Sequence, residues 1–394
     1  MTSLNGHSSR IRQSLHESIH MIHREDWMDV AEDASPYLRY DHLLVLEDAM
    51  QGAMDFRYAI YYSEDNLPIG IACFQIADLV DQGSAYRAAV QKLGKGIGGR
   101  IIKEMKVRCV VSGNVFRCGD HGSHFKPGVS DAHRFLAIEE TLRRLDKGCY
   151  FRPMASVLIV KDLWQQQYAQ AQELERKGFA PLTMEPNMVM EVDPAWKDLD
   201  AYQEALNAKA RTRLRAVLKR SEALTMRRLD AHGIRGNAGV LQDLFDQVLD
   251  RTPFAFGRLN VAVYAPWKEQ WGEDLLFQGY FLDDRLVGFA TAFVLDDVLD
   301  VQYVGLDYAH NETHGVYHRM LLDLLEFAMQ RGSRKILFGR TAEQAKSNLG
   351  ALPVDMRFYV RHRNAIANKL VGPFLRSVRP EAFEQRSPFK KMPA

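Results

Sequence analysis

A loop near residue 120 has the residue types of an acid–base site. The strand-like run 107–113 leads into Asn114-Val-Phe-Arg-Cys-Gly-Asp-His-Gly122, which carries Asp120 and His121 between glycines. Neighbouring aspartate and histidine side chains can face one site, and a histidine that titrates near neutrality can act as a general base. A turn histidine with a structural hydrogen bond would look the same. Both interpretations stay open, with Asn114 and Asp120 as candidate substrate ligands.

A basic segment at residues 206–224 could bind an anion. Arg211, Arg215 and Lys219 are spaced i, i+4 and i+8, so they form one ridge on the predicted helix. Such a ridge can bind a polyphosphate, a tRNA backbone or anionic lipid headgroups. A solvated helix face has the same composition and is the commoner case.

Histidines near the N-terminus could suggest a metal site. Residues 1–14 are polar and rich in Ser and His, and His16, His20 and His23 follow. We favour a mobile, solvated arm over residues 1–14 and expect no metal site.

Polar residues also collect where the elements predicted over residues 299–360 end. The pattern predicts a strand ending at Tyr308, a long amphipathic helix from Val316 to a C-cap at Gly332, and a short buried strand at residues 335–339. A short helix ending at Gly350 and another strand at residues 356–360 follow. We therefore expect the polar residues at these strand ends to share one neighbourhood.

These elements carry a family resemblance. Gly305-Leu-Asp-Tyr308, the long helix, Phe338-Gly-Arg-Thr341, Lys346 and Leu349-Gly-Ala351 resemble the C-terminal half of the GNAT acyltransferase superfamily. More narrowly, the chain is similar to the two-domain branch that includes the Fem-type peptidoglycan aminoacyltransferases and many bacterial GNAT proteins. The segment Gln385-Arg-Ser-Pro-Phe-Lys390 also resembles this branch.

The resemblance implies an α/β (α+β) protein with two tandem GNAT-like domains, each a mixed, mostly antiparallel sheet flanked by helices. The first half repeats the helix, strand, helix, strand order that ends the second half. We place the boundary at Asp193-Pro194, which gives an N-terminal domain over 15–192 and a C-terminal domain over 193–394 whose first helix is the basic one.

The chemistry that the resemblance implies is direct acyl transfer to an amine, without a nucleophilic serine or cysteine. The candidate catalytic residues are Asp307, Tyr308, Arg340 and His121, with His310 and His314 as candidate substrate ligands. Asp or His would accept a proton, whereas Arg340 and Lys346 would hold an anionic group, as would Arg211, Arg215 and Lys219.

A second stretch matches a family motif. Gln91-Lys-Leu-Gly-Lys-Gly96 fits the Q/R-x-x-G-x-G/A pyrophosphate loop of GNAT enzymes, with Gln91, Gly94 and Gly96 at the motif positions. It follows a predicted helix, so a glycine-broken surface helix is the alternative. The loop after Tyr308 lacks this glycine-rich pattern.

Composition limits location and partners. The net charge of +1 gives no overall nucleic-acid signature, and DNA is not an expected partner. The four cysteines form no CxxC pair, and no run of about 20 apolar residues occurs. We expect a cytoplasmic protein with reduced thiols. The protein could also make peripheral contact with an anionic inner membrane.

Three functions fit these observations. The first is an N-acyltransferase that uses acyl-CoA or an acyl carrier as co-substrate, binds no permanent cofactor, and acylates a primary amine such as a long-chain amino lipid, because some two-domain relatives resemble bacterial sphingolipid N-acyltransferases. The second is an aminoacyl-tRNA-dependent transferase, although residues 206–305 leave no room for a long helical arm. The third is a catalytically silent binding scaffold.

Overall fold

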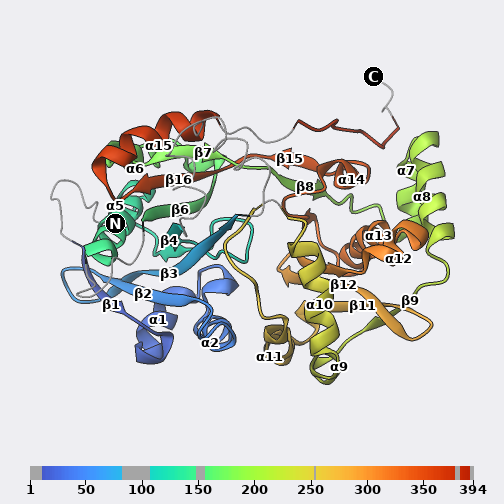
Figure 1. The fold of residues 1–394 in the computed structure, drawn as a ribbon, viewed down its shortest axis with the longest axis horizontal. Helices are drawn as coiled ribbons and strands as arrows, with labels where there is room; N and C mark the ends of the chain where they lie inside the picture. The colour runs from blue at the N-terminus through green and yellow to red at the C-terminus, as the bar shows by residue number, and fades with distance from the viewer. Residues whose placement is uncertain (1–10, 82–106, 148–155, 253, 378–381, 391–394) are drawn as a thin grey trace, which may run out of the picture. The chain divides into compact units, whose positions relative to one another are not determined.

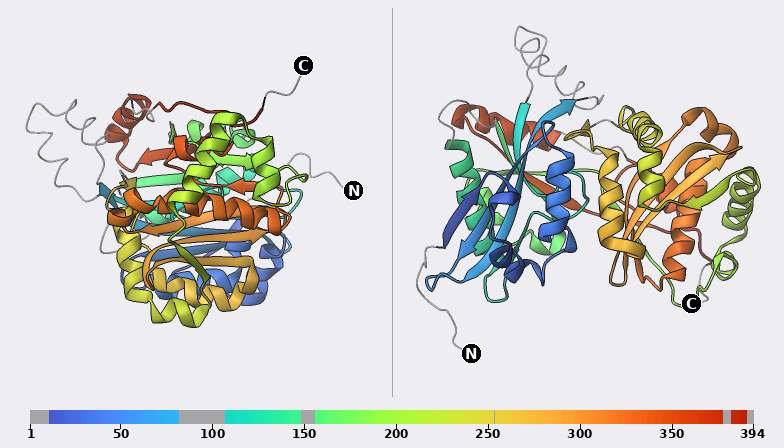
Figure 2. Two further views of the ribbon diagram at one scale, coloured as in Figure 1. Left: turned by 90° about the vertical axis from the view of Figure 1, so that its right-hand side faces the viewer. Right: turned by 90° about the horizontal axis from the view of Figure 1, so that it is seen from below.

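The computed structural model describes residues 11–81, 107–147, 156–252, 254–377 and 382–390. The described chain divides into two compact units. Unit 1 takes residues 11–80, 107–147, 156–183 and 357–377, and unit 2 takes residues 81, 184–252, 254–356 and 382–390. Each unit has its own sheet with its own helices (Figures 1 and 2).

The sheet of unit 1 has the order β1-β2-β3-β4-β6-β16-β7. β1, β2, β3 and β4 pair antiparallel, and β4 and β6 pair in parallel. The elements are β1 (Arg12–His16), α1 (Arg24–Ala31), α2 (Tyr40–Ala49), β2 (Asp55–Tyr62), β3 (Pro68–Asp81), β4 (Val107–Ser112), β5 (Ser123–Phe125), α5 (Asp131–Lys147), β6 (Val157–Trp164), α6 (Gln172–Arg176), β7 (Ala180–Thr183), β16 (Met356–His362) and α15 (Ala365–Ser377).

The sheet of unit 2 has the order β15-β8-β14-β13-β12-β11-β9. The elements are β8 (Asn187–Glu191), α7 (Leu199–Ala205), α8 (Ala208–Arg220), β9 (Thr225–Arg228), α9 (Ala231–Gly236), α10 (Ala238–Leu249), β10 (Phe254–Ala255), α11 (Tyr264–Trp271), β11 (Leu275–Leu282), β12 (Arg285–Leu295), β13 (Val298–Leu306), α12 (Tyr308–His314), α13 (Val316–Gln330), β14 (Lys335–Leu337), α14 (Glu343–Ser347) and β15 (Leu352–Val354).

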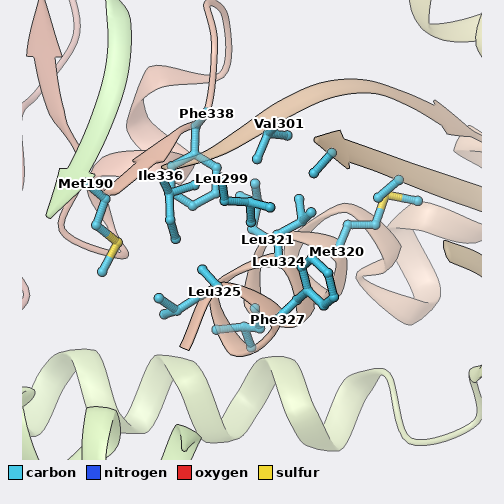
Figure 3. Packing of buried hydrophobic residues seen from close by; sticks show 14 of the residues in the cluster. Met190, Leu299, Val301, Met320, Leu321, Leu324, Leu325, Phe327, Ile336 and Phe338 are labelled. Carbon is cyan, nitrogen blue, oxygen red and sulfur yellow. The ribbon is translucent and has the colours of Figure 1, made fainter. Parts of the chain in front are cut away.

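The core of unit 2 lies between α13 and one face of the sheet. Leu321, Leu324 and Leu325 of α13 pack in one cluster with Leu299 and Ile336 of the central strands (Figure 3). Each fully buried leucine or isoleucine contributes about 1.5–3 kcal/mol relative to exposure. This apolar face, rather than helix propensity alone, therefore holds α13 on the sheet.

The opposite face of β13 is covered by α10. Phe245 of α10 packs edge-on against Tyr303, with ring centroids 5.0 Å apart. A Cβ added to Gly305 would lie 2.9 Å from the Cβ of Leu244. Glycine at residue 305 therefore allows α10 to approach β13 closely.

Two features differ from the predicted domains. β1 begins at Arg12 and pairs with β2, so the last residues of the expected arm belong to a strand. β8 pairs with β14 in unit 2, whereas β16 pairs with β7 in unit 1. Each of these two strands belongs to the unit opposite to the one predicted, because strand pairing depends on partners distant in sequence.

Candidate functional site

β13 and β14 pair as parallel strands only where they begin. Their last pair joins Asp300 to Leu337, yet β13 continues to Leu306. The next residue, Phe338, donates its N–H to the carbonyl of Met188 on β8 at 2.8 Å. Among the described strands, none pairs with this side of β13 beyond Asp300. The two strands therefore part beyond Asp300, and we refer to this parting of the strands as the β13–β14 cleft.

A buried carboxylate lies where the two strands part. Asp300 is 1% exposed, and Gln302 Nε2 donates to its Oδ2 at 2.5 Å. Its neighbours Leu299 and Val301 belong to the core that contains α13. Because side chains alternate along a strand, Asp300 faces the opposite side, which α10 covers.

A β-bulge follows Asp300. The pairing of β12 and β13 skips a residue, so Gln302 and Tyr303 together face Thr291. The Thr291 hydroxyl donates to the carbonyl of Tyr303 at 2.8 Å. Bulges commonly re-aim side chains beside active sites, and here Gln302 reaches back to Asp300.

Two tyrosines lie near the end of β13. Tyr308 begins α12, and the Arg251 guanidinium lies 3.8 Å from the centre of its ring. Burial raises the pKa of Tyr308, against the effect of Arg251. Tyr317 lies in the first turn of α13, and burial, then the neighbouring Tyr308 and Glu343, raise its pKa. Both phenols therefore stay protonated near neutral pH and can donate hydrogen bonds.

Asp307 caps a helix. Its Oδ1 accepts the N–H of Ala309 at 3.0 Å, and its Oδ2 lies 2.9 Å from Arg285 Nη2 and 3.9 Å from His310 Nε2. The segment after Tyr308, expected as a loop, is the helix α12, because Asp307 caps its start and Gly315 its end. His310 and His314 lie one turn apart on it, with ring centroids 6.2 Å apart. Asp307, Tyr308, His310 and His314 thus lie together on α12 and its cap, and their predicted catalytic and binding roles stay predictions.

Arg340 and Lys346 lie beyond the end of β14. Lys346 is 4% exposed, and its ammonium donates to the carbonyls of Gly339 at 3.1 Å and of Arg340 at 2.6 Å. Arg340 Nε donates to the carbonyl of Glu185 at 3.0 Å. These contacts fold the turn after β14, and the predicted binding of an anion by the two residues stays a prediction.

In unit 1 the loop after β4 is packed against β6. Lys161 and Asp162 are buried, the Lys161 ammonium donates to the carbonyl of Arg117 at 2.5 Å, and Asp162 Oδ2 accepts the N–H of Gly119 at 3.1 Å. Asp162 adopts a φ of 61°, which is unfavourable for a residue other than glycine. Side chains of β6 therefore hold the loop in place.

Asn114 and Asp120, the first two of the three candidates in this loop, have structural partners. Asn114 is buried and accepts the N–H of Phe116 at 3.0 Å. Asp120 accepts from Arg134 Nη2 at 2.5 Å and from Gln167 Nε2 at 2.8 Å.

His121 lies beside α2 and the turn before it. A hydrogen bond of 2.9 Å joins its Nδ1 to the hydroxyl of Ser35, and Tyr37 packs edge-on against its ring. Burial lowers the pKa of His121 to about 4, with Lys161 and Arg117 acting in the same direction. The imidazole is therefore neutral at neutral pH and a weak base.

Sequence reasoning missed several residues near the two ends of β13. Asp300 could have been found, since it is a charged residue within an otherwise apolar strand pattern, Val298-Leu-Asp-Val301. Tyr317, Glu343 and Arg251 carry no comparable signal, because only the fold brings their elements together. Gln91, Gly94 and Gly96 lie outside the described residues.

The fold is that of solved tandem GNAT proteins. No protein-family model matches the chain, and a search of curated proteins found no match. The structure of FemX is similar over 92% of this chain and 100% of its own, with 12% identity and a TM-score of 0.52. A tandem GNAT protein from the clavulanic acid biosynthesis pathway matches over 90% and 99%, with 10% identity and a TM-score of 0.50.

A third solved structure is the C-terminal domain of a putative lysylphosphatidylglycerol synthetase from Agrobacterium fabrum. The match covers 88% of this chain and 93% of that domain's chain, with 9% identity and a TM-score of 0.50. The predicted two-domain GNAT fold is therefore confirmed. The helices in the described ranges are too short or too polar to cross a bilayer.

Proposed function

We propose that the cleft between β13 and β14 is the active site of an N-acyltransferase that moves an acyl group from a thioester to a primary amine. One observation carries the proposal: the pairing of β13 with β14 ends at Asp300, which puts a buried carboxylate where the two strands part. The tandem GNAT fold supports the same class of reaction.

The residues near the two ends of β13 offer the groups that direct transfer needs. The amine nitrogen attacks the thioester carbonyl, a C–N bond forms, and the C–S bond breaks. Asp300 accepts the proton that the amine loses, and the protonated phenol of Tyr317 supplies one to the departing thiolate. A backbone N–H group polarises the carbonyl oxygen, as in the direct acyl transfer that the family resemblance implies.

We assign the reaction to unit 2 rather than unit 1. In unit 1 the connection after β4 is tied to Lys161 and Asp162 of β6, and His121 is a weak base. In unit 2 the edge of β13 has no such covering among the described strands. The acceptor that we favour is a long-chain amino lipid, which is a proposal from the sequence resemblance alone.

The test measures thiol release from an acyl thioester in the presence of a panel of primary amines that includes a long-chain amino alcohol, with the amide identified by mass spectrometry. Asp300→Asn and Tyr317→Phe should each lower kcat/KM by about 10² to 10⁴. The matched control is Asp297→Asn, an exposed acid three residues away in the turn before β13.

Two results would contradict the proposal. Full activity in Asp300→Asn would remove the carboxylate from the mechanism. A wild type that acylates no amine from any thioester, yet accepts an aminoacyl-tRNA, would favour the tRNA-dependent function.

A further inference from the structure

α8 is a helix with many cations and no acid. Within α8 and among the described residues, none of its basic side chains forms an ion pair with a carboxylate. α8 lies at one edge of unit 2 (Figures 1 and 2). A helix of its length spans about 20 Å, which exceeds the size of one phosphate group. The basic residues are Lys209, Arg211, Arg213, Arg215, Lys219 and Arg220.

The exposed face of α8 is charged but carries no large apolar group. The exposed cations of α8 are Lys209, Arg215, Lys219 and Arg220. Its exposed uncharged residues are Ala208, Thr212 and Ala216. Single-stranded nucleic acids bind through aromatic side chains that stack on bases, and interfacial helices insert large apolar side chains into the bilayer. This face offers neither, so its chemistry fits an acidic surface with which it makes electrostatic contacts.

The end of α8 lies beside the candidate active site. Arg220 Nε donates to the carbonyl of Thr313 in the last turn of α12 at 3.1 Å. α12 begins with Tyr308, whose ring lies at the end of β13. A partner bound along α8 would therefore lie next to α12, the helix that follows β13.

In the connection between β13 and α13, side chains already bind backbone N–H groups. A helix N-terminus binds phosphate through its unpaired N–H groups. Here the Asp307 carboxylate caps α12, and the Asn311 side chain accepts the N–H of Tyr317 in the first turn of α13 at 3.0 Å. Side chains of this connection thus occupy donors that a CoA pyrophosphate would use, and Asp307 adds a negative charge.

We propose that α8 docks an acidic acyl carrier protein, which presents the acyl thioester on its phosphopantetheine arm. This inference rests on the proposed function and names the donor for it. The arm carries a single phosphodiester in place of the pyrophosphate of CoA, and the acidic face of the carrier supplies the anions that α8 lacks. Charge complementarity would then place the thioester at the edge of β13.

The experiment compares three octanoyl donors with one amine: a holo acyl carrier protein, CoA and pantetheine. The double variant Arg215→Glu/Lys219→Glu should lower kcat/KM for the carrier-bound donor by roughly 10- to 100-fold, because electrostatic steering is reversed. Its kcat/KM for octanoyl-pantetheine should be unchanged, since that donor has no carrier to dock. Raising the salt concentration should weaken the wild type only with the carrier-bound donor.

The matched control is Arg228→Glu/Arg334→Glu, which changes the net charge equally at exposed residues away from α8. It should leave all three donors unaffected. Direct binding of a fluorescently labelled holo carrier, measured by anisotropy, tests docking even if no transfer occurs. Suppose that the wild type binds the carrier but transfers no acyl group, and that Arg215→Glu/Lys219→Glu abolishes this binding. The proposed function then fails, and the docking surface stands.

Three results would overturn the inference: equal kcat/KM for CoA and the carrier in the wild type, an α8 variant as active with the carrier as the wild type, or an equal loss with all three donors. So would binding of bulk tRNA or of phosphatidylglycerol vesicles that depends on Arg215 and Lys219, without any preference for the carrier-bound thioester.

Discussion

Two carboxylates near the ends of β13 have different surroundings, and these separate their roles. Asp300 is buried within the strand and hydrogen-bonded to Gln302. Asp307 follows the strand and is bound to the backbone of α12 and to Arg285. A cap that already satisfies a helix N-terminus is poorly placed to take a proton from a substrate. We therefore assign the proton acceptor to Asp300.

This assignment predicts different effects of two substitutions at Asp307. Asp307→Ala removes the cap of α12 and should cost about 0.5–2 kcal/mol of unfolding free energy. Asp307→Asn keeps a side-chain oxygen at the cap and should cost little, because the Arg285 partner is 68% exposed and such pairs are weak. Urea denaturation measures both. A stable Asp307→Asn protein without transfer activity would return the catalytic role to Asp307, as the sequence predicts.

His121 should make unit 1 sensitive to acid. Burial lowers its pKa to about 4 in the folded protein, from 6.5, so the unfolded chain takes up the proton first. The stability that neutral His121 contributes to the folded protein is therefore fully present above pH 6.5. As the pH falls toward 4, up to roughly 3 kcal/mol of the free energy of unfolding is lost. His42, which is buried nearby with a lowered pKa, acts in the same direction.

The measurement is the free energy of unfolding at pH 7 and at pH 5. Wild type should lose more stability over this interval than His121→Gln, which cannot take up the proton. An identical loss in both proteins would show that His121 does not titrate in this way.

At the scale of elements, those with a local residue pattern are the ones that can be predicted from the sequence. The predicted long helix agrees with α13, because its apolar spacing and Gly332 are signals within a few residues. α12 was missed because a short polar helix has no apolar period, and its signs are the cap at Asp307 and the left-handed Gly315. The parting of β13 and β14 has no local signal either, since it depends on the contact of Phe338 with β8.

The turn after β14 should depend on Lys346. Its ammonium binds two carbonyls of a turn in which Thr341 and Ala342 adopt φ values of 63° and 51°. Lys346→Met leaves those carbonyls without the donor and should cost about 1.5–3 kcal/mol, the range for hydrogen bonds to charged groups. Chemical denaturation tests this. A variant of full stability that loses activity would instead support the anion-binding role predicted from the sequence.

At the scale of the whole molecule, the most important feature is an exchange of two strands, β8 and β16, between the two predicted domains. β8 lies before the predicted boundary but completes the sheet of unit 2, and β16 lies after it but separates β6 from β7 in unit 1. The residue pattern predicts the strand at 356–360, yet alternation says nothing about which sheet a strand joins. No single cut in the chain can therefore separate the two sheets.

The exchange predicts that a fragment of residues 15–192, the predicted N-terminal domain, does not fold alone. It lacks β16 and α15, and it exposes β8 without its partners β14 and β15. We expect no cooperative thermal unfolding and no near-ultraviolet circular dichroism from the fragment, in contrast to the full chain. A fragment that unfolds cooperatively would contradict the strand order described above.

The central claim is that acyl transfer takes place in unit 2, at the cleft that begins at Asp300. The most direct measurement is kcat/KM for amide formation from an acyl thioester in two full-length variants, Asp300→Asn in unit 2 and His121→Gln in unit 1. We predict a loss of about 10² to 10⁴ in Asp300→Asn and near wild-type activity in His121→Gln, with both proteins folded at pH 7. The reverse pattern, a fully active Asp300→Asn with an inactive His121→Gln, would contradict the account and place the chemistry in unit 1.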